Sequence, residues 1–381
     1  MKLDPQLKRD LVPLLARLFS LQENIKTILD LANAPIGNLQ LEGPAQIVWS
    51  RVISYAEEND LVLEILEAAL SEMPGSEGLK QIIEEIKNGD QKRIKRLAKL
   101  IKDRQCILFL GPGMLQVPVE NVQQSFSLAY TDQLKKQLNR SGIYYDSALE
   151  DEPRYISQRV QSGPKYVTGE LGARANDFFN RHRNAINPIV YEQLASLTFP
   201  LVINTNPDKI IWDKIKEARG ESSVEFKFYN QSNSGNFFDL DDLDEAPKQL
   251  PETLVYNIFG AFDVPLSVLF TEADFVKFSK NILQKSPPLH KNVIRQFDEA
   301  KYYLFLGFDF GAWHLKMLLE ALKIVREKNR SISIYGNDPM AHDMEYYDQH
   351  YKFYFCNRDI LHFTTDLLDA FNSNGQTAIN T

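Results

Sequence analysis

FLGPGM, residues 109–114, is the stretch at which an apolar run, residues 107–110, stops abruptly at two glycines. A glycine turn that leaves a strand lets backbone amides approach a phosphate, because glycine has no Cβ and tolerates positive φ. Pro112 stands between the two glycines and has no amide to donate. By itself the stretch indicates either a tight surface turn or a phosphate-binding turn, since the full nucleotide fingerprint needs more residues.

Downstream of this turn, apolar strand-like runs alternate with helical patterns, which is typical of a parallel sheet with crossover helices. The runs are ILFLG, FPLVINTN, VEFKFYN, LVYNIFG, YYLFLGF, ISIYGN and YKFYFC. Residues 105–381 therefore predict a doubly wound α/β domain. Because such a sheet binds ligands at the carboxyl ends of its strands, the residues that follow each run form the candidate site.

Upstream, residues 1–88 show helical spacing of apolar residues, with one stripe that begins at Leu11 and another at Trp49. This spacing predicts an all-α helical bundle. Residues 89–104 predict a basic amphipathic connector helix with an apolar edge. That helix could pack on the next domain with its basic side chains solvated, or it could touch nucleic acid or a membrane surface.

The bulk composition excludes several functional classes. The 381 residues suit two domains, at roughly 100 to 200 residues each. A formal net charge of −8 argues against a broad nucleic-acid-binding surface, so we expect no direct nucleic-acid partner. Cys106 and Cys356 have no neighbours at metal-binding spacing, and we expect free thiols and no metal. Without a signal peptide or a long apolar stretch, we expect a cytoplasmic protein with no membrane partner.

The strand exits carry the residues that suggest a family. In chain order they are GPG (111–113), NTNPD (204–208), NIFGAFD (257–263), GFDFGAWHL (307–315) and YGND (335–338). With their spacing and the flanking TEADF (271–275), these exits resemble the sirtuin family, especially its bacterial sirtuin-like branch. The resemblance covers residues 99–371 and implies a sirtuin-like doubly wound sheet behind the helical bundle.

The resemblance also implies a ligand, NAD or an ADP-ribose-type nucleotide. In the family, a glycine-rich exit cradles the diphosphate of NAD and an asparagine lies beside the nicotinamide ribose. Carried over to this chain, the cofactor-binding residues are Gly111, Gly113, Asn206, Asp208, Phe259, Gly307 and Gly336.

Departures from the family pattern put the chemistry in doubt. Phe259 stands where the family has its catalytic histidine, and a phenyl ring accepts no proton. A general base contributes about 100-fold to 10,000-fold, so its loss indicates a degraded catalytic site. Asn206 matches the family's asparagine, and Asp309 or His314, together with Asp263, could in principle replace the base. For His314 the alternative is a polar cap on the following helix.

The front domain has a resemblance of its own. Leu18 and Phe19, the W-x-x-V-I-x-x-A run from Trp49, and the L-x-x-A-L-x-x-x-P pattern that ends at Pro74 are similar to the effector-associated domains of bacterial conflict proteins. This match covers residues 11–83. It implies a death-fold-like adaptor that binds a protein partner and forms homo-oligomers, whereas the alternative is an ordinary helical dimerisation domain.

Three functional hypotheses follow from the sequence. The first is a component of a bacterial anti-phage system, in which the adaptor recruits or oligomerises a nucleotide-binding sirtuin-like module with a degraded site. The second is an active NAD glycohydrolase that depletes NAD. The third is a nucleotide-free oligomeric scaffold, in which Phe259, Met114 and Leu115 fill the former pocket. Protein deacylation is disfavoured because two cysteines cannot build a four-cysteine zinc module, and hydride transfer because the glycine motif is too short.

Overall fold

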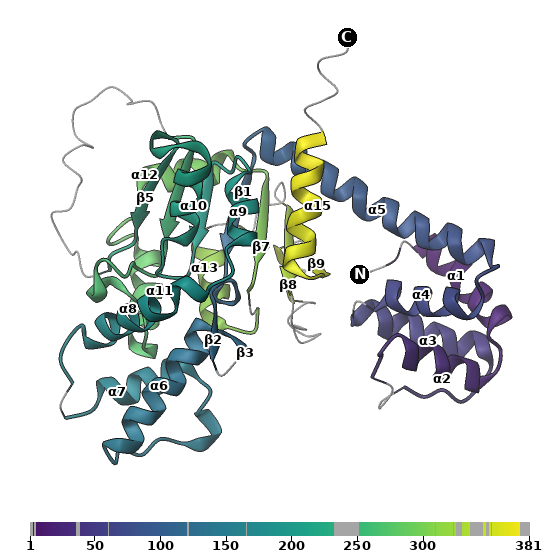
Figure 1. Cartoon of the computed structure of the whole chain (residues 1–381), viewed down its shortest axis with the longest axis horizontal. Helices are drawn as coiled ribbons and strands as arrows, with labels where there is room; N and C mark the ends of the chain where they lie inside the picture. Colours follow the sequence, from purple (N-terminus) through teal and green to yellow (C-terminus); the bar gives the residue numbers. More distant parts are fainter. Residues whose placement is uncertain are drawn as a thin grey trace, which may run out of the picture. The chain divides into compact units, whose positions relative to one another are not determined.

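The structure is a computed structural model. It describes residues 3, 5–35, 39–59, 61–119, 122–164, 166–231, 251–308, 310–322, 324, 330–335, 346–347, 350–351 and 353–373. The chain forms two compact units that divide after Leu97, the first helical and the second built on a parallel sheet. Figure 1 shows these elements in chain order. The predicted sequence of a helical bundle followed by a doubly wound sheet is confirmed.

The helical unit is built from amphipathic helices whose apolar stripes meet in one core. Its helices are α1 (Pro5–Leu18), α2 (Gln22–Leu31), α3 (Ala45–Glu58), α4 (Val62–Glu72) and the first part of α5 (Glu77–Lys102). Trp49 is fully buried at the centre of this core, and its indole N–H donates to the carbonyl oxygen of Phe19 at 3.0 Å. Burial of an aromatic ring of this size is a large part of the stability of a small bundle.

Helix α5 runs without a break through residue 88, where the sequence predicted a domain boundary and the start of a connector helix at 89. Its apolar positions continue from Leu79 and Ile83 to Ile94 and Leu97, all buried, so the helical period is not interrupted. An isolated glycine such as Gly89 is tolerated inside a helix at a cost of about 1 kcal/mol. The basic connector is therefore the second half of a helix of 26 residues.

The second unit contains a sheet of seven strands in the order β5-β6-β4-β1-β7-β8-β9. The strands are β1 (Cys106–Leu110), β4 (Leu201–Asn204), β5 (Val224–Phe228), β6 (Thr253–Asn257), β7 (Tyr302–Leu306), β8 (Arg330–Tyr335) and β9 (Phe353–Asn357). They correspond to the runs predicted from the sequence. Strand β1 pairs in parallel with β4 on one side and with β7 on the other. The chain thus winds away from β1 in both directions, and the switch point lies beside the exit of β1.

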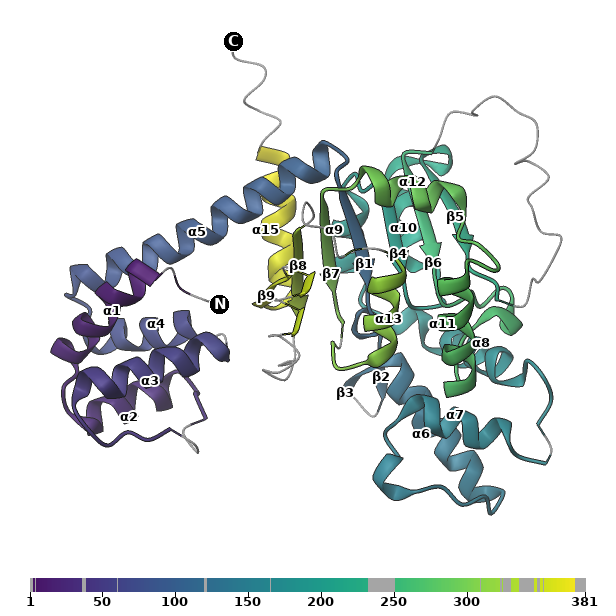
Figure 2. The same ribbon diagram turned by 180° about the vertical axis from the view of Figure 1, so that it is seen from behind.

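Helices cover both faces of this sheet. Helices α9 (Ile189–Ala195) and α10 (Ile210–Arg219) lie on one face (Figure 1), and α12 (Lys291–Glu299) and α13 (Trp313–Ala321) on the other (Figure 2). Two further helices pack at the sides, α11 (Glu272–Gln284) against α13 and α15 (Ile360–Ser373) against α9. The sheet is therefore buried on both faces, which explains why its strands are continuous apolar runs.

An insertion between β1 and β4 lies at the end of the sheet where the strands finish (Figure 1). It begins with an antiparallel hairpin, β2 (Gln116–Val119) and β3 (Val122–Ser125). The helices α6 (Phe126–Arg140), α7 (Pro153–Gln161) and α8 (Glu170–His182) follow. This insertion places new side chains opposite the carboxyl ends of β1, β4, β6 and β7.

Candidate functional site

The GPG turn after β1 is held against the exit of β7. The amide of Gly111 donates to the carbonyl oxygen of Leu306, and that of Gly113 donates to the carbonyl oxygen of Gly307, both at 2.8 Å. The amide of Met114 donates back to Gly111 at 3.1 Å. Since Pro112 has no amide, every donor from residue 111 to residue 114 is absent or already used within the protein.

Close packing between the two exits accounts for the glycines. A Cβ on Gly111 would lie 2.3 Å from the carbonyl oxygen of Gly307, and one on Gly113 would lie 2.9 Å from it. Gly307 itself has φ of +69°, a conformation that side chains disfavour. The three glycines thus allow the backbone segments after β1 and β7 to approach each other closely.

A cavity of about 1040 Å³ opens beside this turn, at the carboxyl ends of the strands. Five residues proposed from the sequence line it: Gly113, Asn206, Phe259, Gly307 and His314. Gly111 and Asp208 lie outside its lining. Asp309 and Gly336 lie outside the residues that the structure describes. The site assembles at the switch point of the sheet, where the topology places it.

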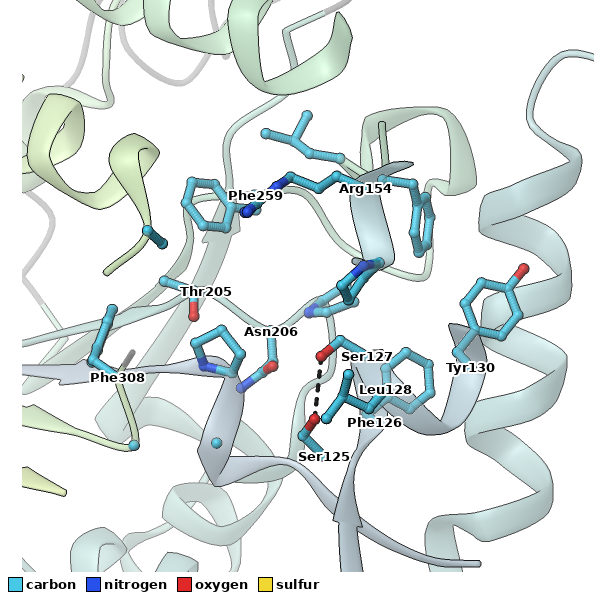
Figure 3. A pocket seen from close by; sticks show the side chains of 18 of the residues that line it. Ser125, Phe126, Ser127, Leu128, Tyr130, Arg154, Thr205, Asn206, Phe259 and Phe308 are labelled. Atoms are coloured by element: carbon cyan, nitrogen blue, oxygen red, sulfur yellow. Dashed lines mark hydrogen bonds between the residues drawn. The ribbon is translucent and has the colours of Figure 1, made fainter. Parts of the chain in front are cut away.

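Asn206 is buried and fixed by two hydrogen bonds. Its side-chain Nδ2 donates to the carbonyl oxygen of Gly111 at 2.8 Å, and its backbone amide donates to Oδ1 of Asn204 at 3.0 Å. The side chain lies at the edge of the cavity (Figure 3). The NTNPD exit therefore fastens the end of β4 to the GPG turn, with the Asn206 side chain at the cavity wall.

Asp208 is fully buried next to the cavity wall and caps helix α10. Its Oδ1 accepts a hydrogen bond from the amide of Ile210 at 2.8 Å, whereas its Oδ2 has no hydrogen-bond partner among the described residues. Asn257 donates to the backbone oxygen of Asp208 at 2.8 Å, which ties the β4 exit to the end of β6. Burial raises the pKa of the Asp208 carboxyl to about 6.

Phe259 occupies the exit of β6 in an aromatic cluster. Its ring centroid lies 5.1 Å from that of Phe275 and 5.2 Å from that of Phe278, both on α11. The imidazole of His314 lies 6.0 Å from Phe259 and 4.7 Å from Phe275. The TEADF stretch starts α11 with a capping box between Thr271 and Asp274 and so holds this cluster in place.

His314 is in the first turn of α13 and is 8% exposed. Its Nδ1 lies 2.8 Å from Nη1 of Arg154, which can only donate, so Nδ1 accepts. Burial, with a contribution from the Arg154 charge, lowers the pKa of His314 to about 3. The ring is neutral near pH 7, and the proton of the neutral tautomer is then on Nε2. Asp263 is ion-paired with Lys209 and lies outside the cavity lining.

Sequence reasoning missed two parts of this site. Arg154, from α7, lies in the insertion stretch PRYISQRVQSG, which looks like an ordinary amphipathic helix. The start of α6 contributes Ser125, Phe126 and Ser127 to the lining, on the opposite side from Arg154 and Phe259 (Figure 3). The one sequence feature that could have indicated the second part is Ser125, because a serine immediately before a helical stripe is typical of a helix N-terminus.

The fold and the cavity define an α/β protein with a cavity at the switch point of a doubly wound parallel sheet, preceded by a helical domain. Residues 200–356 match the family model of the SIR2-like domain, and residues 1–87 match that of effector-associated domain 1. The chain therefore combines a SIR2-like domain with an N-terminal effector-associated domain. The GPG turn precedes the matched part of the SIR2-like domain, whereas Asn206, Phe259 and His314 lie within it.

Similar solved structures are Sir2 proteins. One, described under the mechanism and regulation of Sir2 enzymes, is 11% identical over 74% of this chain and 98% of its own, with a TM-score of 0.35. Another, a Sir2 histidine-to-tyrosine variant with a p53 peptide and NAD, is 12% identical over the same shares, with a TM-score of 0.32. Comparison with curated proteins finds no match.

The described residues offer neither a membrane-spanning helix nor a cluster of metal ligands. Within those residues, none of the helices combines the length and the apolar character needed to cross a bilayer. Nor do three or more His, Cys, Asp or Glu side chains gather anywhere in the described ranges in a way that could hold a metal ion. Cys106 and Cys356 are both buried free thiols, as the sequence predicted.

Proposed function

We propose that this chain is a component of a bacterial anti-phage or other conflict system. In this proposal the effector-associated domain recruits a protein partner or forms homo-oligomers. The SIR2-like domain binds NAD or an ADP-ribose-type nucleotide at a catalytically degraded site. The combination of the two domains in one chain supports this role, because the first is associated with protein interaction and the second with nucleotide binding.

The observation that carries the proposal is an open cavity without an available histidine base. Phe259 occupies the position of the family's histidine and is 7% exposed. His314, the one histidine among the described lining residues, uses Nδ1 to accept from Arg154. An imidazole in that state does not take the proton of a ribose hydroxyl, so we expect binding without efficient cleavage.

The ligand phosphates need donors other than the GPG turn, whose amides are engaged. The start of α6 offers them on the cavity wall, because the first amides of a helix lack partners in the preceding turn. The amide of Phe126 already donates to the carbonyl oxygen of Leu115 at 2.8 Å, so the donors in this proposal are the amides of Ser127 and Leu128. Ser125, the residue before α6, makes no side-chain cap to those amides. Instead its hydroxyl lies 3.3 Å from that of Ser127 (Figure 3). We therefore assign the phosphates to this helix start.

Calorimetric titration with NAD and with ADP-ribose tests the proposal. We expect the wild-type chain to bind at least one of them and Ser127→Trp, which fills the cavity beside α6, to abolish the binding. The matched control is Ser141→Trp at the other, exposed end of the same helix, which should bind normally. Failure of both ligands to bind wild-type protein at millimolar concentration would contradict nucleotide binding.

An active NAD glycohydrolase is the second candidate. It is favoured by Asn206, whose carboxamide is held at the cavity edge where the family's asparagine acts, and would need Asp309 or His314 as the base. Incubation with NAD, alone and with the protein partner, followed by measurement of free nicotinamide, tests it. No release in either setting rejects it. The filled-pocket scaffold is disfavoured, because the cavity is open and Met114 and Leu115 do not line it.

A further inference from the structure

We propose that Arg154 forms an anion-binding subsite on the Phe259 side of the cavity, which receives a phosphate or carboxylate group of the ligand. This inference deepens the proposed function by naming the chemistry that one end of the ligand must carry. It does not depend on which nucleotide the cavity holds.

The guanidinium of Arg154 is held in place from two sides. Its Nε donates to Oε1 of Glu272 at 3.1 Å, and its Nη1 donates to Nδ1 of His314 at 2.8 Å. Its Cζ also lies 5.5 Å from the centroid of the Phe275 ring. None of the described residues accepts a hydrogen bond from Nη2. A fixed guanidinium with spare donors is suited to planar or tetrahedral anions, because its donors are already arranged for them.

Among the charged residues around the cavity, the arginine is partly buried and the acidic residues are exposed. Arg154 is the one Lys or Arg among the described lining residues, and its side chain is 20% exposed. Asp151, Glu152 and Asp359 also belong to the lining, but all three are exposed, and Asp151 pairs with Lys135 at 3.1 Å. The carboxylate of Glu272 is 47% exposed and faces water. Exposed charges are screened more strongly than a partly buried one, so the inner wall is electropositive at Arg154.

The surroundings of this charge restrict the ligand group further. Phe259 and Phe275 lie beside the Arg154 contact with His314 and present apolar rings rather than competing acceptors. Beside these apolar rings, a charge-assisted hydrogen bond to the partly buried guanidinium is stronger than it is in bulk solvent. A neutral group would form a weaker bond, and a cationic group would be repelled by the fixed positive charge.

Small probes separate the two possible anions. We expect pyrophosphate, a phosphate probe, or nicotinate, an aromatic carboxylate, to bind the full-length protein in titrations followed by ligand-observed NMR. Nicotinamide, which differs from nicotinate only in its neutral carboxamide, should bind at least tenfold more weakly than nicotinate. Binding of pyrophosphate alone identifies a phosphate group, and binding of nicotinate alone identifies a carboxylate. Binding of neither anion overturns the proposal.

Two substitutions with opposite expected effects separate an anion site from a merely structural tie between helices. Arg154→Gln should weaken binding of the anion at least tenfold, since a bond to a charged group is lost. Glu272→Gln should strengthen it severalfold, because the carboxylate no longer offsets the guanidinium. Arg183→Gln, which removes an exposed, ion-paired arginine outside the lining, is the control and should leave binding unchanged.

A structural tie predicts another pattern, in which both substitutions lower thermal stability and reduce anion binding alike. That pattern, or unchanged binding in a folded Arg154→Gln protein, overturns the proposal. If Arg154→Gln does not fold, Arg154→Lys keeps the positive charge and should retain part of the affinity, and Glu272→Gln still tests the sign of the effect.

The same titrations keep this inference distinct from the proposed function. Pyrophosphate binding that requires Arg154, together with no binding of NAD or ADP-ribose, supports the subsite and contradicts the nucleotide role. ADP-ribose binding to the wild-type protein, together with binding of pyrophosphate and nicotinate that Arg154→Gln leaves unchanged, supports the nucleotide role and contradicts the subsite.

Discussion

Asp208 is a single buried carboxyl whose environment predicts an unusual pH dependence of stability. In the folded chain the pKa of Asp208 is about 6, against an ordinary value of 3.8 for an aspartate. Between these two pH values the folded state binds more protons than the unfolded state, so the free energy of unfolding falls as pH rises. The difference corresponds to about 3 kcal/mol at about 1.4 kcal/mol per pH unit.

Asp208→Asn should remove this dependence, because asparagine keeps the Oδ1 acceptor for Ile210 but does not ionise. We expect the variant to be close to wild type in stability at pH 4 and up to about 3 kcal/mol more stable at pH 7. Urea unfolding of both proteins from pH 4 to pH 7 measures this. Asp177→Asn, an exposed aspartate on α8, is the control. A variant-to-wild-type difference that stays constant with pH would contradict the prediction.

His314 should make the free energy of unfolding depend on pH in the sense opposite to Asp208. Its pKa is lowered from 6.5 to about 3 in the folded chain, so in this range the unfolded state binds the extra proton. The free energy of unfolding therefore falls as pH falls below about 6.5, by up to about 1.4 kcal/mol per pH unit. His314→Gln should lose this acid sensitivity, which unfolding at pH 4 to pH 7 measures. The exposed His362→Gln should retain the wild-type slope, and an unchanged slope in His314→Gln would count against the assignment.

Among the elements of the fold, the exits of β1 and β7 form a closely packed pair. Gly111→Ala would place a methyl group 2.3 Å from the backbone oxygen of Gly307, and also 2.8 Å from the ring of Phe308. We expect a loss of about 1–3 kcal/mol in the free energy of unfolding, the range typical of overpacking. Gly75→Ala, where a Cβ would meet nothing within 4 Å, should cost much less. Urea unfolding compares the two, and equal losses would show that the close approach is not what requires glycine.

The elements were largely predictable and their mutual contacts were not. Apolar runs such as residues 302–306 indicate strands locally, and the sheet places their ends together. The hydrogen bond from Gly113 to Gly307 joins positions far apart in the chain, so no local pattern could reveal that the turn's amides are used. Likewise, Arg154 looks like a solvated residue of an amphipathic helix until the fold brings it to His314.

On the scale of the whole molecule, each unit has its own core, and the three tryptophans allow the two to be followed separately. Trp49 is buried in the helical unit, whereas Trp212 and Trp313 belong to the α/β unit. Trp49→Ala should cost the helical unit about 3–5 kcal/mol, as for other large-to-small core changes. The remaining tryptophan fluorescence in this variant then reports only the α/β unit.

We therefore expect circular dichroism of Trp49→Ala to show an early loss of helix, while the midpoint of the fluorescence transition stays near that of wild type. Ile47→Ala, on the exposed side of the same helix, should change neither signal. An equal shift of both signals would contradict independent unfolding of the units.

The sequence indicated two domains joined by a connector at residues 89–104, and the two compact units divide after Leu97, within that stretch. Composition and periodicity separate a helical part from an alternating part, which suffices to predict both fold classes. The sequence predicted a separate basic connector helix, whereas α5 runs without a break from Glu77 to Lys102. In this stretch the charged residues mark the solvated side of the helix, and they do not show where the helix begins.

The close packing of Gly111 and Gly113 against Gly307 has a consequence for evolution. Because the collision at Gly111 would be with main-chain atoms, no exchange of a neighbouring amino acid can make room for a bulkier residue there. Compensating mutations should instead be insertions or deletions that move the loop after β7. Lineages that keep both loops at their present lengths are therefore expected to retain all three small residues, even if the ligand changes.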